Sequence, residues 1–571
     1  MSADAGIFYE RVKAANRKKF GCIKNKTQMK TIHEGEKQME TLYFNGDIIT
    51  MEGEGQYVEA VLVADGKIKA AGAYDAVAAQ KSADCELVDL QGKTLMPGFI
   101  DAHGHATMTP AFASLCDLSV CNNFDEIVDA MKAFLEERQI PAGEPVIGVN
   151  YDNNFLAEQA HPTRDVLDRV STEHPVSAVH VSIHAACGNS YALKNINYAD
   201  DMADVPGGEV GRYEDGRING YLAEAAMYPL VFGTLAKVMA DVAAVWDFGQ
   251  NLYLSNGITT VQEGAGNQGN LTLLNALDQA GKVKMDVVVF PTFGSLGGEI
   301  DQIREANPEQ IKQYKGHIKV GGYKLVLDGS PQARTAWMTE PYVGGGCGVP
   351  ILEDAFVLEC MQKALADDMQ TLVHCNGDAA GDQFLNAFET AYNESDNANK
   401  DNLRFTMIHC QTARRDQFEK MAKYGMIPSI FTGHVNYWGD VHMKNFGDVR
   451  GSRVSPVKDA LDLGLVYNFH TDTPVTRPDL MHSVWAAVNR VTRSGRVIGE
   501  DQKVGVYDAL KAITINGAYA YFEEDSKGSI KEGKRADLTI LNANPLKVDP
   551  MAIKDIKVVE TIKDGVSVYK A

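Results

Sequence analysis

The fold is decided by the stretch Pro97-Gly-Phe-Ile-Asp-Ala-His-Gly-His-Ala106. An apolar β-strand is predicted to lead into His103 and His105, which stand two positions apart. Side chains at positions i and i+2 of a strand point to the same face, so both imidazoles can reach one ion. Imidazole is the commonest neutral metal ligand in proteins. The pair alone is a weak motif, because two such histidines are as often structural.

Three later strand ends strengthen the metal interpretation. His374 closes the apolar run from Thr371, His409 closes the run from Phe405, and Asp472 follows the run that begins at Leu465. Polar groups are costly to bury without partners, so packing alone explains this set poorly. In a closed parallel barrel the strand ends converge on one face, where barrel enzymes keep their active sites.

Lys324 lies near the start of another very apolar strand, Gly322-Tyr-Lys-Leu-Val-Leu-Asp328. A lysine that faces into a barrel is costly unless it is neutralised or paired. Near two metal ions it could carry a carbamate derived from CO2 and bridge them. The alternative is that Lys324 points outward or pairs with Asp328, and the sequence leaves both open.

Strand-like and helical segments alternate through most of the chain, which predicts a parallel sheet and, with about eight repeats, a TIM-like (β/α)8 barrel of the α/β class. The predicted strands are 94–102, 146–150, 176–181, 259–262, 284–290, 321–327, 371–373, 405–408 and 465–469. Helices are predicted at 353–366 and 416–424. Residues 106–250 are too long for plain barrel units. They predict an insertion after the first barrel strand, with a glycine-rich β piece at 206–220.

The two ends of the chain have a different pattern, of short antiparallel strands without helices between them. Asn-Gly or Asp-Gly turns are predicted at Asn45, Asp65 and Asp564. Because chain termini often lie close together, we expect residues 40–96 and 521–571 to form one small β-sandwich domain. The barrel would then occupy residues 97–520, and residues 1–39 would form a basic N-terminal arm.

Composition narrows the function classes. The formal net charge of −21 argues against nucleic acid or an anionic membrane as the main partner. The nine cysteines are scattered, without a CxxC pair, and predict a reducing compartment rather than disulfides or a four-cysteine zinc site. With no apolar leader and no membrane-length apolar run, the chain is expected to be cytoplasmic and to act on a small molecule. A homodimer is left open.

The ordered set of HxH, strand-end lysine, two strand-end histidines and aspartate resembles the amidohydrolase superfamily. The closer resemblance is to amidohydrolase family 3, the branch of YtcJ-like and N-substituted formamide deformylase-like proteins, over about residues 40–571. Stretches similar to that branch are 162–168, 184–193, 257–261, 328–330 with 334–336, 374–378 and 528–538.

The resemblance implies a barrel with one or two divalent metal ions, zinc being the first candidate. His103 and His105 would bind the buried metal, Lys324 would bridge if carboxylated, and His374 and His409 would bind the second metal. Asp472 would bind metal and hold the nucleophilic water. Two departures from the branch affect the pocket lining: Cys375 and Asn376 after His374, and His470 where a glycine commonly stands.

These ligands predict a hydrolase that cleaves a non-peptide C–N bond, in an amide, formamide or cyclic amide, with metal-activated water. His184 is expected to act beside Asp472 in catalysis. Asn189, Arg334 and Asp378 are further candidate substrate contacts, and Trp337, Tyr342, Tyr437 and Trp438 are candidates for an apolar pocket.

Three alternatives remain. A deaminase of the same superfamily is less favoured, because such enzymes usually carry a glutamate about three residues after the histidine that corresponds to His374, and none is present here. Isomerase or decarboxylase chemistry could use the same metal site. A non-catalytic binding protein should have lost a ligand residue, and all are present.

Overall fold

The computed structural model describes residues 40–181, 183, 185–203, 205, 208–231, 242–293 and 299–571. The predicted basic arm, residues 1–39, and His184 lie outside the described residues. Within the described ranges, no helix has the length and apolar character needed to cross a bilayer. The eight cysteines of these ranges are all free thiols.

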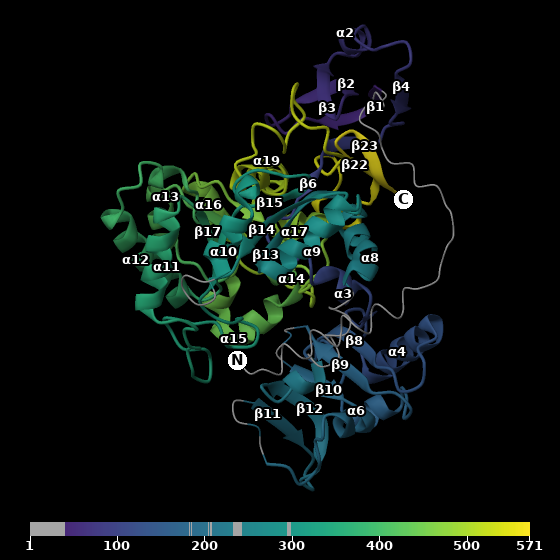
Figure 1. Cartoon of the computed structure of the whole chain (residues 1–571), viewed down its shortest axis with the longest axis vertical. Coiled ribbons are helices and arrows are strands. Elements are labelled where there is room, and N and C mark those ends of the chain that lie inside the picture. Colours follow the sequence, from purple (N-terminus) through teal and green to yellow (C-terminus); the bar gives the residue numbers. More distant parts are fainter. Residues whose placement is uncertain are drawn as a thin grey trace. The chain divides into compact units, whose positions relative to one another are not determined.

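Strands from both ends of the chain share one eight-stranded sheet, in the order β23-β22-β21-β5-β1-β2-β3, with β4 paired to β1 (Figure 1). Its strands are β1 (Thr41–Ile49), β2 (Tyr57–Ala64), β3 (Lys67–Gly72), β4 (Glu86–Asp89), β5 (Thr94–Pro97), β21 (Leu538–Leu541), β22 (Val558–Lys563) and β23 (Val566–Lys570). β5 and β21 join the two ends of the chain as an antiparallel pair, with Leu95 opposite Ile540. The predicted turns at Asp65 and Asp564 are confirmed, since each links an antiparallel strand pair.

The predicted turn at Asn45-Gly46 is wrong, because β1 continues through it as one strand. The pairing of β1 with β2 shifts register between Phe44 and Ile48, and Asn45 has a φ of 60°. A Cβ at Gly46 would lie 2.4 Å from the carbonyl oxygen of Lys93. The Asn-Gly pair therefore forms a bulge that admits a close backbone approach.

The middle of the chain contains two parallel ladders, ordered β15-β14-β13-β6 and β16-β17-β18-β19-β20. The first contains β6 (Phe99–Ile100), β13 (Ile258–Gly266), β14 (Asp286–Pro291) and β15 (Ile318–Val320). The second contains β16 (Gly322–Val326), β17 (Gln370–Cys375), β18 (Thr406–His409), β19 (Ile427–Ile430) and β20 (Asn468–Phe469). A parallel bridge between Thr292 and Lys324 links the ladders.

Helices separate most of these strands, which confirms the predicted mixed α/β class. Examples are α9 (Gln268–Gln279), α11 (Asp354–Ala366), α12 (Asp378–Glu394) and α13 (Arg415–Lys423). The helices predicted at 353–366 and 416–424 correspond to α11 and α13.

A separate six-stranded sheet lies between β6 and β13 in the sequence, in the order β11-β12-β10-β9-β8-β7. Its strands are β7 (Cys116–Asp117), β8 (Val146–Tyr151), β9 (Val176–His180), β10 (Ala185–Gly188), β11 (Gly208–Arg212) and β12 (Ile218–Glu224). The prediction that placed 146–150 and 176–181 in the series of alternating strands is therefore wrong. These strands pack into apolar clusters of their own, around residues such as Met131 and Leu222.

Candidate metal centre

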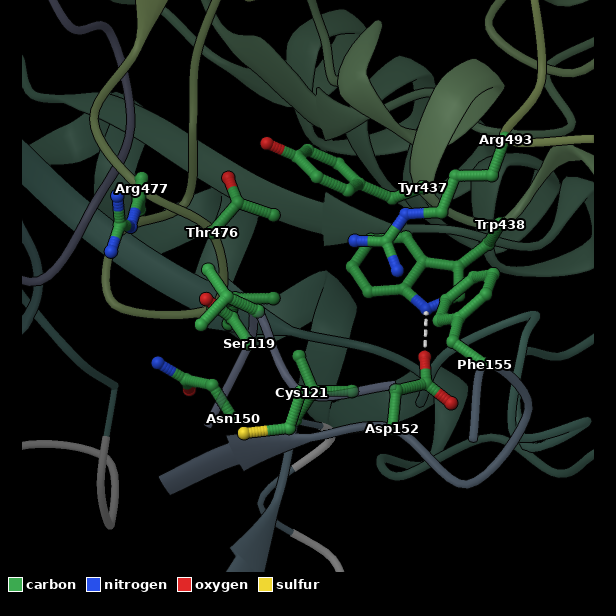
Figure 2. Close-up of a pocket in the computed structure, with 13 residues that line it drawn as sticks. Ser119, Cys121, Asn150, Asp152, Phe155, Tyr437, Trp438, Thr476, Arg477 and Arg493 are labelled. Atoms are coloured by element: carbon green, nitrogen blue, oxygen red, sulfur yellow. Dashed lines mark hydrogen bonds between the residues drawn. The ribbon is translucent and has the colours of Figure 1, made fainter. Parts of the chain in front are cut away.

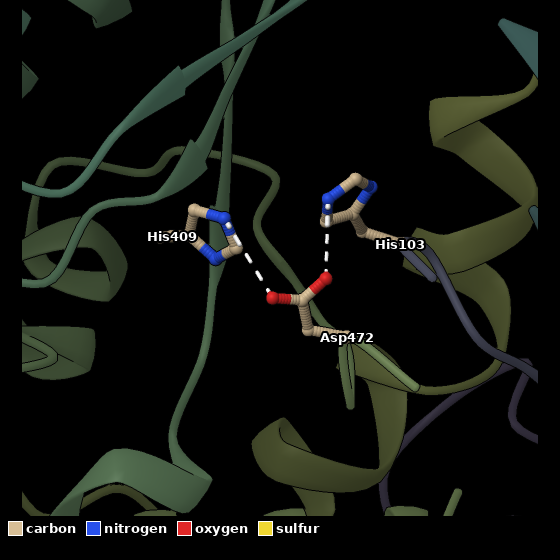
Figure 3. Close-up of side chains that lie close together, drawn as sticks. All are labelled: His103, His409 and Asp472. Carbon is tan, nitrogen blue, oxygen red and sulfur yellow. Dashed lines mark ion pairs between the residues drawn. The ribbon is translucent and has the colours of Figure 1, made fainter. Parts of the chain in front are cut away.

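The ends of the parallel strands bring the predicted ligands together. His103 and His105 follow β6, His409 ends β18, and Asp472 follows β20. The Nε2 atoms of His103 and His105 lie 3.5 and 3.3 Å from Oδ1 of Asp472. Nε2 of His409 lies 4.0 Å from Oδ2 of the same carboxylate (Figure 3). One ligand atom from each of His103, His409 and Asp472 can be chosen so that all lie within 4.8 Å of one another.

Lys324 and His374 complete this cluster. Nζ of Lys324, in β16, lies 3.2 Å from Nε2 of His103. Nδ1 of His374, in β17, lies 3.1 Å from Nε2 of His409. Lys324 is buried, with 2% of its surface exposed, so it does not point outward. The structure thus brings together all six residues that the sequence nominated as metal ligands.

Hydrogen bonds define which nitrogen of His103 faces the cluster. Its Nδ1 lies 2.5 Å from Oε1 of Gln262, which can only accept a hydrogen bond. The amide of Gln262 is oriented by its Nε2, which donates to the carbonyl oxygen of Ala102 at 2.8 Å. Nδ1 of His103 therefore carries the proton, and Nε2 presents a lone pair to Asp472.

His374 is oriented in the opposite sense. Its Nε2 lies 3.2 Å from the carbonyl oxygen of Gly329 and 3.0 Å from Nδ2 of Asn376, so Nδ1 is the nitrogen that faces His409 and the cluster. His409 contacts a further histidine on its other side, where its Nδ1 lies 3.1 Å from Nε2 of His470. Nδ1 of His470 lies 2.8 Å from the hydroxyl of Ser429, in β19.

Burial keeps these imidazoles neutral. It lowers the pKa of His374 to about 4 and of His470 to about 3, and it holds the pKa of His103 and His409 well below the ordinary value. Burial acts to raise the pKa of Asp472, but the close approach of His105 and the nearby Lys324 ammonium bring it below its ordinary value. The cluster therefore combines the neutral imidazoles of His103, His374, His409 and His470 with an ionised carboxylate.

This donor set fits a cation. Oδ1 of Asp472 and Nδ1 of His105 are buried and have no hydrogen-bond partner in the described structure. Lone pairs of neutral imidazoles facing a carboxylate repel one another unless a positive charge lies between them. Imidazole and carboxylate at this spacing are the ligands that divalent zinc takes in proteins.

The other nominated residues within the described ranges have local structural contacts, and no described contact joins them to the cluster. Asn189 caps helix α6 (Ser190–Asn195), where its side chain accepts a hydrogen bond from Ala192 N. Arg334 donates to the carbonyl oxygens of Val343 and Gly345. Asp378 accepts from Thr339 and pairs with Arg414 at 3.2 Å. His184 lies outside the described residues.

Gln262 and Ser429 were not nominated from the sequence, although both orient histidines of the cluster. Gln262 lies in β13 and is 1% exposed, so it is a buried polar residue on a parallel strand. That is the property that identified His374 and His409, and it would have identified Gln262. Ser429 carries no comparable signal, because a single serine in an apolar strand is unremarkable.

The sequence comparison decides the family. The family model described as "Amidohydrolase family" matches residues 86–569. The chain belongs to this family. The resemblance to amidohydrolase family 3 is thereby confirmed.

Curated relatives match nearly the whole chain. N-substituted formamide deformylase of Arthrobacter pascens is 27% identical over 544 residues, which cover 93% of this chain and 98% of the relative. The YtcJ protein of Bacillus subtilis (strain 168) is 26% identical over 549 residues, covering 93% of this chain and 100% of the relative.

Solved structures support the fold. An uncharacterized metal-dependent hydrolase from Pyrococcus horikoshii OT3 superposes with a TM-score of 0.69 at 23% identity, covering 90% of this chain and 99% of that one. A second, from Pyrococcus furiosus, also has a TM-score of 0.69, at 24% identity, over 89% of this chain and 100% of that one.

Proposed function

We propose that this chain is a metal-dependent hydrolase that cleaves a non-peptide C–N bond in an amide, a formamide or a cyclic amide. The observation that carries the proposal is the convergence of three imidazoles on the two oxygens of Asp472, within 3.3 to 4.0 Å. Family membership supports hydrolysis of C–N bonds, and the formamide deformylase relative makes formamides the first substrates to test.

We also infer that the two parallel ladders close into one (β/α)8 barrel. Support comes from hydrogen bonds between the ends of the first and last strands. Asp472 N donates to the carbonyl oxygen of His103 at 3.0 Å, and His105 N donates to that of Thr473 at 2.8 Å. The side chain of Asp101 accepts from Thr471 N at 3.1 Å. These contacts would close the barrel between its first and last strands, and so hold His103 and His105 beside Asp472.

His103, His105, His374, His409 and Asp472 would hold one or two divalent ions, with zinc as the first candidate. When bound, such an ion lowers the pKa of a coordinated water to about 7 and polarises a substrate carbonyl. Gln262 fixes the ring of His103, and His470 with Ser429 fixes the ring of His409. The protein thus sets each ligand's orientation through a second hydrogen bond.

Lys324 would carry a carbamate. Burial lowers the pKa of its ammonium to about 8, so about a tenth is the neutral amine at pH 7, far more than for an ordinary lysine. Nζ of the neutral amine can bond to the carbon of CO2 and release one proton, which leaves an anionic carbamate. That anion would replace an ammonium that is unfavourable beside a bound divalent ion.

Asp472 would move the proton. Its carboxylate accepts a proton from the attacking water as the new C–O bond forms, and it returns that proton to the leaving nitrogen as the C–N bond breaks. The products are a carboxylic acid and an amine, or formate and an amine when a formamide is cleaved. Oδ1 of Asp472 is free for this role, because it has no hydrogen-bond partner in the described structure.

A panel assay tests the proposal directly. The metal-loaded protein should hydrolyse at least one member of a set of N-formyl, N-acyl and cyclic amides, measured as release of amine or formate. Ammonia release from aminated heterocycles, without hydrolysis of any amide, would instead establish the deaminase alternative. If elemental analysis shows bound metal and no C–N bond is cleaved, the amidase proposal is wrong.

Metal content gives a test that needs no substrate. We expect His103→Ala and His105→Ala to lose most of the bound metal after dialysis, because each removes an imidazole from the ligand set. The matched control is His174→Ala, which removes a buried histidine whose Nδ1 contacts the carbonyl oxygen of Glu144 in the insertion. Full metal stoichiometry in both variants would remove these two histidines from the site.

A further inference from the structure

A cavity of about 220 Å³ lies beside the segment that follows β8 (Figure 2). That segment contributes Asp152 and Phe155. Tyr437 ends helix α14 (Gly433–Tyr437) and is followed by Trp438, and Arg493 follows helix α17 (Leu480–Asn489). For comparison, a closed apolar cavity of roughly 150 Å³ accommodates benzene. The cavity is therefore large enough for one aromatic ring and a small polar group.

The cavity adjoins the metal cluster. Val475, on its wall, donates its backbone N–H to the carbonyl oxygen of Asp472 at 2.8 Å. The ring of Trp438 lies 6.4 Å from that of Phe431, which in turn lies 6.2 Å from the ring of His409. One layer of side chains therefore lies between the cavity and the ligands, and the short segment from Asp472 to Val475 reaches from the metal cluster to the cavity wall.

Arg493 presents a positive charge to this cavity. Its guanidinium carbon lies 3.9 Å from the centre of the Phe155 ring and 5.4 Å from that of Tyr437. Among the residues that the structure describes, no carboxylate lies within 4.0 Å of this guanidinium. The other arginine of the lining, Arg477, is paired with Asp117 at 2.6 Å.

Asp152, the acidic residue of the lining, contacts other side chains of the protein. Oδ2 of Asp152 accepts a hydrogen bond from Nε1 of Trp438 at 3.0 Å, and Oδ1 lies 3.7 Å from Nε2 of His180. Figure 2 shows the Asp152 carboxylate beneath the indole of Trp438, joined to its nitrogen by a dashed line. The cavity thus offers an anion a cation that forms no direct ion pair with the described residues, in a chain whose net charge of −21 otherwise repels anions.

We propose that this cavity binds the part of the substrate that carries an aromatic ring and a carboxylate, with Arg493 binding the carboxylate. This rests on the proposed hydrolase function and specifies its substrate class. A planar guanidinium matches a carboxylate with two parallel hydrogen bonds. Because the Arg493 side chain already stacks on Phe155, it loses few conformations when it binds a carboxylate. Tyr437 and Trp438 provide flat apolar walls for an aromatic ring.

Binding of two matched probes tests this without hydrolysis. 3-Phenylpropionate and 3-phenylpropanol share a ring and a chain, differ in charge, and contain no C–N bond. Isothermal titration calorimetry on the metal-loaded protein should show the carboxylate binding at least tenfold more tightly than the alcohol. In Arg493→Gln the carboxylate should bind at least tenfold more weakly, since a charged hydrogen-bonding partner is lost, while binding of the alcohol changes less than about twofold.

The control variant is Arg496→Gln, on the same loop. Arg496 is half exposed, pairs with Asp448 at 3.1 Å and does not line the cavity, so the preference for the carboxylate should persist. Arg493→Lys keeps the charge and should retain part of that preference. Because wild type and Arg493→Gln are compared at equal metal content, carboxylate binding to the metal itself does not produce the difference.

Equal carboxylate affinity in wild type and Arg493→Gln would overturn the proposal. If Arg493→Gln binds neither probe, the result for Arg493→Lys replaces it as the test. If Arg493→Lys then shows no preference for the carboxylate over the alcohol, the proposal is also wrong. A failed panel assay with an intact probe difference would reject the hydrolase function and leave the anion-binding cavity standing. If the protein hydrolyses amides but binds both probes equally well, the hydrolase function stands and the anion-binding cavity is rejected.

Discussion

Replacing Asp472 by asparagine is expected to lower kcat/KM by about 10²- to 10⁴-fold, the range typical of losing a general acid–base group. The asparagine has nearly the same size but cannot accept and return the proton of the attacking water. The change should also weaken metal binding, because an anionic ligand facing His103 and His105 becomes neutral. The measurement is steady-state hydrolysis of the best amide from the panel, with metal content determined on the same sample.

The fold should tolerate this change, because Oδ1 of Asp472 has no hydrogen-bond partner to lose among the described residues. Asp508→Asn is the matched control, since Asp508 is partly exposed and pairs with Lys511 on helix α18 (Val506–Ala512). That control should keep wild-type activity. An Asp472→Asn protein that keeps full activity with full metal content would show that this carboxylate is not the proton-transfer group.

The proximity of the nominated ligands could be predicted because it follows from strand register. In neighbouring parallel strands the carboxyl ends meet at one edge, so a residue that ends each strand meets its counterpart. The structure has Val326 opposite His374 and Cys375 opposite His409. His103 and His105 lie beyond the end of β6, yet both reach the same oxygen of Asp472, as expected for positions i and i+2.

The groups that orient the ligands could not be predicted in the same way. Gln262 is 159 residues from its partner His103, and the hydrogen bond exists only once β6 and β13 are paired. Ser429 lies on β19, a strand of the sequence Ile-Pro-Ser-Ile that was not predicted at all. Pro428 at its centre lacks an N–H, which argues against a strand on sequence grounds. The pairing of Met407 with Pro428 shows that tertiary packing overrides that preference.

The six-stranded sheet of β7 to β12 shows a second limit of prediction from sequence. The apolar runs at 146–150 and 176–181 were identified as strands, and β8 and β9 confirm that they are. Their assignment to the alternating series failed because hydrophobicity indicates a buried strand without indicating which sheet buries it. Only the pairings of β8 with β7 and β9 separate these strands from the other parallel ladders.

A second large effect is expected far from the metal cluster, at Asp286. Asp286 begins β14, is fully buried, and is contacted by several cations. Its Oδ2 lies 2.5 Å from Nζ of Lys527, 3.1 Å from Nζ of Lys563 and 3.1 Å from Nη1 of Arg535. These contacts connect a strand of the parallel ladder to the C-terminal segment, so this carboxylate holds together parts of the chain that are distant in sequence.

Asp286→Asn is expected to lower the free energy of unfolding by about 3–5 kcal/mol, the usual effect of removing one partner from a buried ion pair. The substitution removes the counter-charge that the ammonium groups of Lys527 and Lys563, each 2% exposed, share. Lys527 then keeps only Glu523 at 2.7 Å, and Lys563 keeps Asp537 and Asp564 at 3.0 Å, among the described residues. The measurement is urea unfolding followed by tryptophan fluorescence. Asp462→Asn, which breaks an exposed pair with Lys458 on helix α16 (Val457–Asp462), is the control and should change stability by less than about 1 kcal/mol.

The pH dependence separates an ionic role of Asp286 from a packing role. Burial acts to raise the pKa of this carboxyl, but Lys527, Lys563, His317 and Arg535 together hold it well below the ordinary value. A carboxyl whose pKa is depressed on folding adds stability that is fully present above its unfolded pKa, about 3.9, and is lost as the pH falls through the folded pKa. The stability difference between wild type and Asp286→Asn should therefore be constant from about pH 7 to 5 and shrink only below about 3.9. A difference that stays the same under those acidic conditions would mean that the substitution acts through packing and not through the charge of Asp286.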